Sequence, residues 1–215
     1  MTNSIKLYGA GYSTCTKRVL LVAAELGIEI ELVNTDLSTG AHKTPEFLKL
    51  QPFGQIPALI DSDGTVLYES RAISRYLAKK YGKGVSPLYP LNDDKQFGLV
   101  EQWISVEQSN YDPSISGLTY EGFFKPVFYS GVPDPAAVEA HRKKVAPILD
   151  VYETHLSTHK YLAGDHLTIA DLFHIPYGYC TYTKTPNADL FDSRPHLKAW
   201  FLGLINSPKA AKILA

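Results

Sequence analysis

The stretch Gln51-Pro-Phe-Gly-Gln-Ile-Pro57, followed further along by Glu69-Ser-Arg71, is the part of the sequence that most constrains the fold. A proline entering the apolar run 56–60 belongs at the first residue of a strand, because proline has no N–H to donate to the ladder. If the bond between Ile56 and Pro57 is cis, the Ile56 N–H and C=O turn outward and can pair with a peptide lying alongside. The stretch therefore predicts a strand edge open to a peptide ligand.

Glu69 and Ser70 open a predicted helix. The apolar and aromatic residues that recur after them at helical spacing are Ala72, Ile73, Tyr76, Leu77 and Tyr81. Ser70 stands where unpaired backbone N–H groups and the positive end of the helix dipole attract a carboxylate, and Glu69 offers a negative charge to an ammonium. Each feature alone is common at the start of a strand or helix. Together they favour a site for an amino acid joined to a peptide.

Composition places the chain among globular proteins and excludes several functions. The 215 residues are 45% hydrophobic and 20% charged, which is enough for one large or two small cores. A net charge of -1 without a Lys/Arg-rich run disfavours nucleic acid and acidic membranes as partners. A strand expected at 5–8 leaves no room for a signal peptide, and no apolar run reaches transmembrane length, so we expect a cytoplasmic protein. Cys15 and Cys180 form no Cys-x-x-Cys pair, which disfavours a redox pair and a disulfide framework.

The chain is predicted to divide near residue 85, where glycines and prolines cluster. We expect a first domain at 1–82, a linker at 83–92 and a second domain at 93–215. The elements expected in the first domain are strands at 5–8, 29–34, 58–60 and 65–67, with a helix at 14–26 that Gly27 ends. Asp63-Gly64 predicts a hairpin between the last two strands. The order of a βαβ unit, a short helix and a ββα unit is that of a thioredoxin-like domain.

Beyond residue 92 the apolar spacing is helical, and no strand is expected. One predicted helix face is formed by Val138, Val145, Ile148, Leu149, Tyr152 and Leu156, and another by Leu99, Trp103, Ile104 and Glu107. Thr168-Ile-Ala-Asp171 predicts a capping box at a helix start, with Leu167 and Leu172 as its hydrophobic staple. We interpret Asp171 as a buried structural group and not as a catalytic acid.

These segments together resemble the phi class of the glutathione transferases, a class that uses serine. The matching segments are Gly40-Ala-His-Lys43, Pro52-Phe-Gly-Gln55, Glu69-Ser-Arg-Ala72, Tyr111-Asp-Pro113, Phe124-Lys-Pro126, Leu149-Asp-Val-Tyr-Glu153, Lys160-Tyr-Leu-Ala-Gly164, Leu172-Phe-His-Ile-Pro176 and Leu190-Phe-Asp-Ser-Arg-Pro195. The resemblance implies an α/β thioredoxin-like N-terminal domain and an all-α C-terminal domain. It also implies glutathione as co-substrate, no metal, a homodimer, and hydrophobic electrophiles as second substrates.

Ser13 is the predicted centre of the chemistry. Gly9 and Gly11 let the chain leave the first strand sharply, so that Ser13 falls at the start of the next helix, where it could serve simply as an N-cap. A nucleophilic serine would need a general base, and no His or Asp-His pair follows in a recognisable order. We therefore expect Ser13 to donate a hydrogen bond to a thiolate that the ligand supplies.

The family resemblance assigns roles to further residues. Ser13 becomes the catalytic hydroxyl. The residues implied to bind glutathione are Ser13, His42 and Lys43 at the glycyl carboxylate, Gln55, Ile56 and the cis Pro57 at the cysteinyl part, and Glu69, Ser70 and Arg71 around the γ-glutamyl end. For the electrophile site we expect Tyr12, Tyr120 and Phe123 from an apolar, aromatic wall.

Alternatives remain open at this stage. Cys15 lies two residues past Ser13 and could be a reactive thiol, although we interpret it as a packed small hydrophobe. Tyr12 or Tyr8 could provide the activating hydroxyl, with Tyr8 expected to pack. The fold would also suit a carrier of hydrophobic ligands, or an interaction module like the one in the gamma subunit of translation elongation factor 1. Phe53, in the loop before the third strand, is expected to be covered by a partner subunit or by the helical domain.

Overall fold

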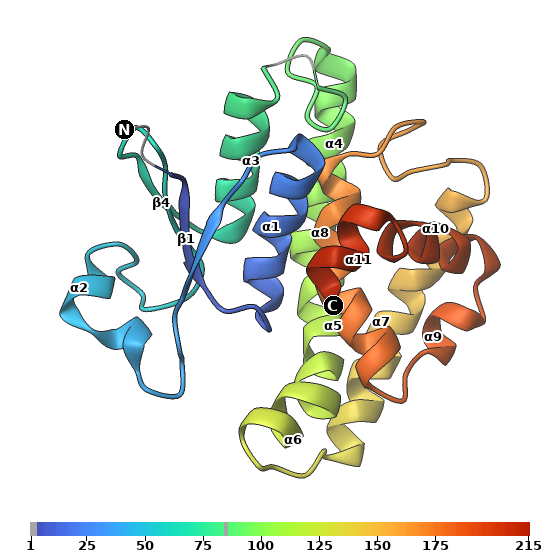
Figure 1. Ribbon diagram of the computed structural model, residues 1–215. Helices are drawn as coiled ribbons and strands as arrows, with labels where there is room; N and C mark the ends of the chain where they lie inside the picture. Colours follow the sequence, from blue (N-terminus) through green and yellow to red (C-terminus); the bar gives the residue numbers. More distant parts are fainter. Residues whose placement is uncertain (1–3, 84–85) are drawn as a thin grey trace. The chain divides into compact units, whose positions relative to one another are not determined.

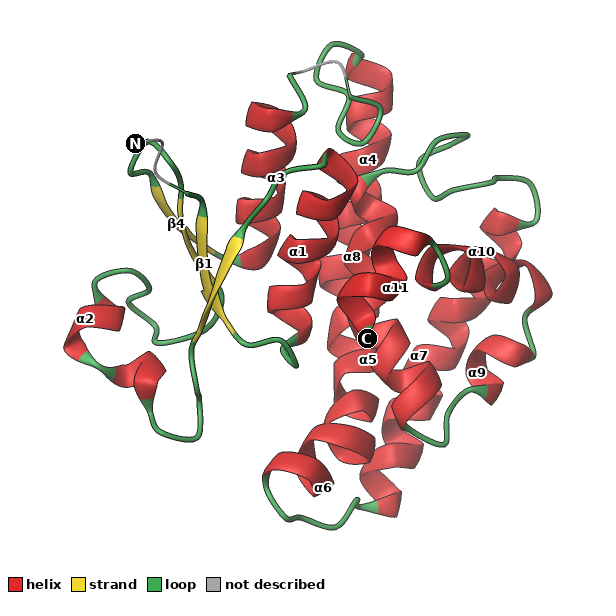
Figure 2. Cartoon of the chain, in the orientation of Figure 1, coloured by secondary structure: helices red, strands yellow, loops and turns green. Residues whose placement is uncertain are grey.

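A computed structural model of the chain describes residues 4–83 and 86–215. The residues group into two compact units, Met1–Leu91 with Ala215, and Asn92–Leu214. Residues 84 and 85, where the sequence pattern places the division, lie outside the described residues. Figure 1 labels most helices and two of the strands, and Figure 2 distinguishes helices from strands.

The first unit is a four-stranded mixed sheet with helices on both faces. Its elements are β1 (Lys6–Gly9), α1 (Thr14–Leu26), β2 (Glu31–Asn34), the 3-10 turn η1 (Ala41–Lys43), α2 (Pro45–Leu48), β3 (Ala58–Ile60), β4 (Val66–Tyr68) and α3 (Ser70–Tyr81). The strand order is β2-β1-β3-β4, in which only the β1–β2 pair is parallel. The thioredoxin-like architecture expected from the sequence is confirmed. Figure 1 shows α1 and α3 beside each other on one side of the sheet and α2 on the other.

Three strands differ from their sequence predictions. The first is shifted by one residue, to Lys6–Gly9. The second begins at Glu31 and not at residue 29, because its ladder partner Lys6 is the first residue of β1. Leu32 lies in register with the buried Leu7, but β2 is at the sheet edge and Leu32 stays 38% exposed. The fourth strand is shifted by one residue, to Val66–Tyr68.

The core of the first unit lies between the sheet and the α1–α3 pair. Its buried members are Ile5, Leu7, Val19, Leu59, Ile73 and Leu77. The helix α1 ends at Gly27, whose φ of 69° is left-handed and whose N–H bonds the last-turn carbonyls of Ala23 and Ala24. This packing fixes the N-terminal ends of α1 and α3 on one rigid scaffold.

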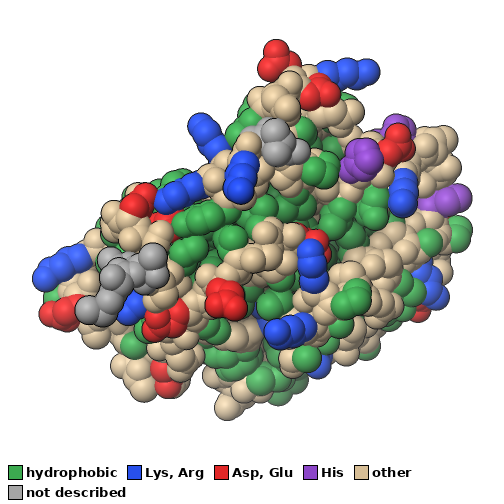
Figure 3. Space-filling view, turned by 45° about the horizontal axis from the view of Figure 1, so that its top comes forward, with side chains coloured by type: hydrophobic (Ala, Val, Ile, Leu, Met, Phe, Trp, Pro, Cys, Tyr) green, Lys and Arg blue, Asp and Glu red, His purple; other side chains and the backbone are tan. Residues whose placement is uncertain are grey.

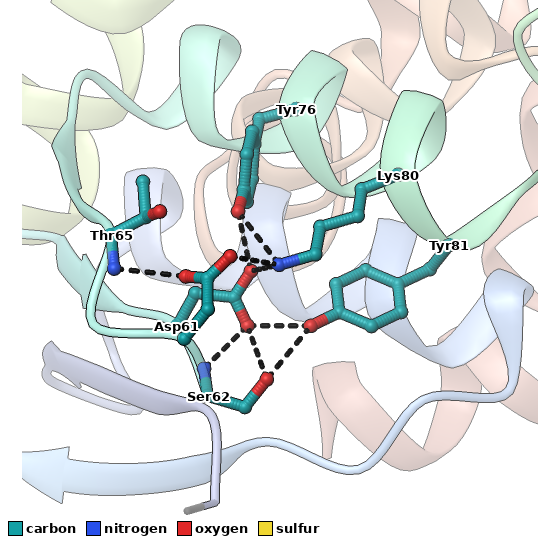
Figure 4. A network of polar contacts seen from close by, with 7 residues as sticks. Asp61, Ser62, Thr65, Tyr76, Lys80 and Tyr81 are labelled. Atoms are coloured by element: carbon teal, nitrogen blue, oxygen red, sulfur yellow. Dashed lines mark hydrogen bonds and ion pairs between the residues drawn. The ribbon is translucent and has the colours of Figure 1, made fainter.

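A polar network joins the hairpin β3–β4 to the last turns of α3 (Figure 4). The Asp61 carboxylate accepts hydrogen bonds from the Tyr76 hydroxyl (2.6 Å), the Lys80 ammonium (2.7 Å) and the Tyr81 hydroxyl. Lys80 also contacts Asp63 at 2.7 Å, beside Gly64 in the predicted turn, whose φ is 87°. The far end of α3 is thereby held to the sheet.

The second unit is built of helices joined by loops. Its elements are α4 (Asp94–Val106), η2 (Glu107–Tyr111), α5 (Asp112–Thr119), η3 (Tyr120–Phe124), α6 (Lys125–Phe128), α7 (Pro135–Leu156), α8 (Ile169–Lys184), α9 (Asp189–Asp192), α10 (Pro195–Ile205) and α11 (Pro208–Leu214). Within residues 92–214 the only β pairing is an isolated bridge between Tyr161 and Gly164. The expected all-α architecture is confirmed.

Two wide π turns, η2 and η3, interrupt the path from α4 to α6. Pro113 follows η2 and Pro126 follows η3, each as an early residue of the next helix. A proline lacks the N–H for an α-helical bond and its ring crowds the carbonyl four residues before it. A wider turn relieves that crowding, and such turns are frequent at functional sites. The sequence pattern alone does not predict these turns.

The core of the second unit is aromatic and polar. Buried Tyr152 stacks edge-on with Trp103 (5.2 Å between centroids) and donates its hydroxyl hydrogen to Nε2 of His174 at 2.8 Å. The other nitrogen of His174 donates to the Ala170 carbonyl at 2.7 Å, which fixes the tautomer. Both ring nitrogens of His174 therefore have partners inside the helical core, and its role is structural.

Asp171, in α8, is fully buried as expected. Its carboxylate accepts the Thr168 N–H (2.9 Å) and hydroxyl (3.0 Å) of the predicted capping box. It also accepts the Leu162 N–H and the Trp200 indole N–H, each at 3.0 Å. The carboxylate therefore connects the loop before α8, the start of α8, and α10.

The surface carries charges of both signs. Lys/Arg and Asp/Glu side chains are interspersed on the face shown in Figure 3, in keeping with the net charge of -1. Among the described residues, no helix combines the length and the apolar character needed to cross a lipid bilayer.

Candidate functional site

Ser13 is the N-cap of α1. Its hydroxyl oxygen accepts the Thr16 N–H at 3.3 Å, and its own N–H bonds the Ala10 carbonyl at 3.0 Å. Gly9 is required in this turn, because a Cβ atom there would lie 2.5 Å from the Thr16 hydroxyl. A serine hydroxyl has one hydrogen and two lone pairs. Capping uses a lone pair, so the half-buried Ser13 keeps its hydrogen for a ligand.

The loop before β3 has the predicted cis bond. The Ile56–Pro57 peptide is cis, which confirms the expectation, and Pro57 is buried directly before β3. Ile56 is half-buried and Gln55 is exposed. Both lie at the edge of a small cavity and not in the core.

The start of α3 faces the same loop. Glu69 is the N-cap residue, with a left-handed φ of 67°, and its side chain is exposed. Ser70 is the first helical residue and is only 5% exposed. The first N–H groups of α3 have no partner within the helix, and the 12-residue helix has the positive end of its dipole here. Both features favour an anion at this end.

A cavity of about 70 Å³ lies between these segments. It is lined by Cys15, Gln51, Gln55, Ile56, Pro57, Glu69, Ser70 and Arg71. Six of these were candidates from the sequence, and the fold brings them together around one concavity. Ser13, His42 and Lys43 do not line it. Cys15 and Gln51 were not assigned to the site from the sequence.

Gln51 is a member of the site that sequence reasoning missed, although it opens the diagnostic motif. It is 2% exposed, and its side-chain oxygen accepts the Phe53 N–H at 2.6 Å. The amide thus braces the loop that carries Gln55 and Ile56. The sequence signal that could have identified Gln51 is its position as a polar residue at the start of the motif 51–57.

Cys15 differs from its interpretation as a packed hydrophobe. It is half-buried and lines the cavity. The guanidinium of Arg18, three residues further along α1, donates to its sulfur at 3.6 Å. Residues three apart share a helix face, so the face with Cys15 and Arg18 is the one that α1 turns toward α3.

His42 and Lys43 lie on η1, outside this cavity. The Lys43 ammonium donates to the Phe53 carbonyl at 3.1 Å and packs against Gly54, where a Cβ atom would lie 2.7 Å from the ammonium nitrogen. The buried Nδ1 of His42 has no hydrogen-bond partner among the described residues. Both side chains therefore have unused hydrogen-bonding capacity.

The candidate electrophile residues are aromatic and accessible. Tyr12 is 37% exposed, in the turn after β1. Tyr120 and Phe123 both belong to η3, where Tyr120 lies 6.1 Å from the Tyr129 ring and Phe123 lies 6.0 Å from the Phe128 ring, centroid to centroid. Tyr8 points elsewhere: it lines a separate cavity of about 340 Å³ with residues of β2 and α2.

The described residues contain no group of three or more His, Cys, Asp and Glu side chains placed to hold a metal ion. The strand edge expected from the sequence is not present, because β3 is paired with β1 on one side and with β4 on the other, and Ile56 lies in the loop before it. The site offers instead a hydroxyl, two helix N-termini, the backbone of the cis-proline loop, and charges of both signs. That set suits an anionic tripeptide with a thiol.

Comparison with known proteins identifies the family. The model for "Glutathione S-transferase, N-terminal domain" matches residues 3–79, and the one for "Glutathione S-transferase, C-terminal domain" matches residues 119–208. Glutathione S-transferase PM239X14 of Arabidopsis thaliana is 49% identical over 203 residues, covering 92% of this chain and 90% of the relative.

Two solved structures agree with this relative. Glutathione transferase F7 from Populus trichocarpa superposes with a TM-score of 0.92 at 41% identity, covering 97% of each chain. Maize glutathione S-transferase I, solved with an atrazine glutathione conjugate, has a TM-score of 0.91 at 36% identity, covering 99% of this chain and 97% of that one.

The fold and site define a two-domain transferase with a thioredoxin-like first unit. The chain belongs to the glutathione S-transferase family, and its relatives confirm the resemblance to the phi class. Its function is glutathione transfer, with glutathione as the co-substrate.

Proposed function

We propose that this transferase activates glutathione through the Ser13 hydroxyl and passes the thiolate to hydrophobic electrophiles. The observation that carries the proposal is the N-cap geometry, in which the Ser13 oxygen accepts the Thr16 N–H and leaves its hydrogen available. A thiol with a pKa of about 8.5 is only a few per cent ionised at pH 7. A hydroxyl donor and a helix N-terminus both stabilise the ionised form.

The rest of the tripeptide is proposed to lie along the cis-proline loop. The Ile56 backbone and Gln55 pair with the cysteinyl part, while Glu69, Ser70 and Arg71 hold the γ-glutamyl end. The shared cavity supports this arrangement. His42 and Lys43 take the glycyl carboxylate, for which Lys43 exchanges its neutral acceptor, the Phe53 carbonyl, for a charged one.

The domain roles follow from this arrangement. Residues 1–82 bind glutathione, 83–92 form a linker, and 93–215 contribute the apolar electrophile site through Tyr120 and Phe123, with Tyr12 from the first domain. Haloarenes, isothiocyanates, enals and organic hydroperoxides are the proposed electrophile classes. The atrazine conjugate seen in the maize relative supports the first of these. We also propose that the enzyme acts in the cytoplasm as a homodimer.

The alternative functions are less well supported. The full-length match to transferases disfavours an elongation-factor interaction module. A carrier role for hydrophobic ligands is compatible with catalysis but has no observation of its own in its favour.

Substitutions at Ser13 separate capping from catalysis. Ser13→Ala should lower turnover of a haloarene, at neutral pH and saturating glutathione, by roughly ten- to a hundredfold. Ser13→Asp keeps a good cap but puts a negative charge beside the thiolate, so it should fold as well as the wild type and be less active than Ser13→Ala.

Asp93→Ala is the matched control, because it removes the N-cap of α4, where Asp93 accepts the Gln96 N–H at 3.0 Å. It should lower the melting temperature and leave turnover unchanged. Wild-type turnover in Ser13→Asp would overturn the proposed role of Ser13.

A further inference from the structure

Arg18 is a buried cation on the scaffold that joins the two helix N-termini. It lies on α1, five residues after Ser13, and its side chain is fully buried. One guanidinium nitrogen, Nη1, donates to the Ser70 hydroxyl oxygen at 2.9 Å and to the Cys15 sulfur at 3.6 Å. Both of those side chains line the cavity, whereas Arg18 does not. Arg18 therefore lies behind the site and contacts it through two of its lining residues.

The contact with Arg18 determines what Ser70 can do. A guanidinium can only donate hydrogen bonds, so the Ser70 oxygen must be the acceptor in their 2.9 Å bond. One of its lone pairs is thereby occupied, while its single hydrogen remains. Ser70 is the first residue of α3 and opens on the cavity, so that hydrogen is available to an acceptor placed there.

The charge of Arg18 adds to this effect. Charges interact more strongly in a protein interior than in water, because the local dielectric constant is lower. The Ser70 hydroxyl separates the Arg18 guanidinium from the cavity. The guanidinium charge therefore strengthens the binding of an anion in the cavity and weakens the binding of a cation. Arg71 lines the cavity itself and would act on the ligand directly.

We propose that Arg18 is a positioning residue for glutathione: it orients the Ser70 hydroxyl as a donor to the γ-glutamyl carboxylate and places a positive charge behind it. The inference rests on the proposed placement of the γ-glutamyl end at Ser70. It assigns to Arg18 selectivity for the carboxylate of that end, and no contact with the substrate.

The test compares glutathione with 4-aminobutyryl-Cys-Gly, which keeps the ammonium but lacks the γ-glutamyl carboxylate. In Arg18→Met, which retains the side-chain length without the charge, KM for glutathione should rise roughly tenfold, equivalent to about 1.4 kcal/mol. KM for the analogue and for the haloarene should change less than about twofold, because neither has the carboxylate. A solely structural role would raise all three values together.

Three companion variants make the outcome decisive. Arg75 lies one turn after Arg71 on α3 and does not line the cavity. Arg75→Met should therefore leave the preference for glutathione over the analogue unchanged. Arg18→Lys keeps the charge and should retain most of that preference. Arg18→Gln, which is uncharged and polar, is the variant to use if Arg18→Met does not fold. Ser70→Ala should raise KM for glutathione, and the effect of Arg18→Lys or Arg18→Met should be smaller in its background.

The outcomes distinguish this inference from the proposed function. If Ser70→Ala leaves KM for glutathione unchanged, the placement of the γ-glutamyl end at Ser70 is wrong. If Ser70→Ala raises KM but a folded Arg18 variant without the charge keeps the full preference for glutathione, or adds its effect independently of Ser70, only the role of Arg18 is overturned.

Discussion

At the scale of single residues, Asp61 is a strongly perturbed carboxylate outside the site. Burial acts to raise its pKa, but the hydrogen bonds from Lys80, Tyr76, Tyr81 and the Ser62 N–H outweigh burial and hold the pKa well below its usual range. The Lys80 ammonium contacts both Asp61 and Asp63, and its pKa is raised chiefly by the hydrogen bond to Asp61. The ionised carboxylate therefore stabilises the fold.

This shift predicts a pH dependence of stability. A carboxyl group whose pKa is lower in the folded state contributes its full stability above the unfolded pKa, about 4, and loses it as the pH falls further. Asp61→Asn should be less stable than the wild type by about 2 kcal/mol at pH 7. The difference between the two proteins should shrink between pH 5 and pH 3, as followed by urea unfolding. A difference that stays constant over that range would show that the charge of Asp61 is not what stabilises the hairpin.

At the scale of elements, η3 is held by a close contact and an ion pair. A Cβ atom on Gly122 would lie 2.7 Å from a Thr185 methyl carbon at the end of α8. The adjacent Glu121 is buried, pairs with Lys125 at 2.9 Å and accepts the Asp134 N–H at 2.8 Å. The position of Tyr120 and Phe123 therefore depends on a small residue at position 122.

Gly122→Ala should displace η3 and alter the electrophile site selectively. We expect KM for a haloarene to rise by roughly three- to tenfold, because a misplaced aromatic wall loses about 1 kcal/mol of contact. KM for glutathione should not change. Gly203→Ala, in α10 and with open space at its Cβ position, is the matched control and should be neutral or stabilising. Equal KM values for the haloarene in both variants would argue against η3 as part of the site.

We expect the Asp171 carboxylate to contribute more to the free energy of unfolding than a simple N-cap residue does. Burial raises its pKa, and hydrogen bonds from Leu162, Thr168 and Trp200 oppose that shift. Asp171→Ala leaves three buried N–H groups without their acceptor and should lower the free energy of unfolding by about 3 to 4 kcal/mol. Chemical denaturation measures this loss, and the folded fraction should bind glutathione as the wild type does. Unchanged stability with lost catalysis would move Asp171 into the active site.

The elements that the sequence predicted well are those with local causes. The helix at 14–26 begins at a capping serine and ends at a left-handed glycine, and both signals lie within the segment. The cis bond at Pro57 and the box at Thr168 likewise follow from short motifs.

The features that the sequence did not predict depend on contacts between distant segments. Cys15 reaches the cavity because α1 packs against α3, and helical spacing alone does not say which neighbour a face meets. Lys43 binds the Phe53 carbonyl ten residues away, and Asp61 collects donors from α3. The wide turns η2 and η3 arise from prolines inside an otherwise regular helical pattern.

At the scale of the whole molecule, we predict a homodimer. Phe53 is 65% exposed, and its ring meets Tyr68 edge-on with centroids 6.2 Å apart. We expect this exposed aromatic pair to be covered in the dimer. Sedimentation at micromolar concentration should give a dimer mass, and Phe53→Ser should shift it toward monomer. Val132→Ser, at a residue 82% exposed in the second unit, is the control. A sharp monomer mass for the wild type would exclude the dimer.

The central claim is that Ser13 stabilises the thiolate of bound glutathione, and its most direct test is an ultraviolet difference titration of that thiolate. A hydrogen bond to an ionised acceptor contributes about 1.5 to 3 kcal/mol, and about 1.4 kcal/mol corresponds to one pKa unit. The wild-type midpoint should lie below that of free glutathione, and Ser13→Ala should raise it by about one to two units. An identical midpoint in the two proteins, with full activity in Ser13→Ala, would contradict the claim and assign activation to Tyr12, Cys15 or the helix N-terminus alone.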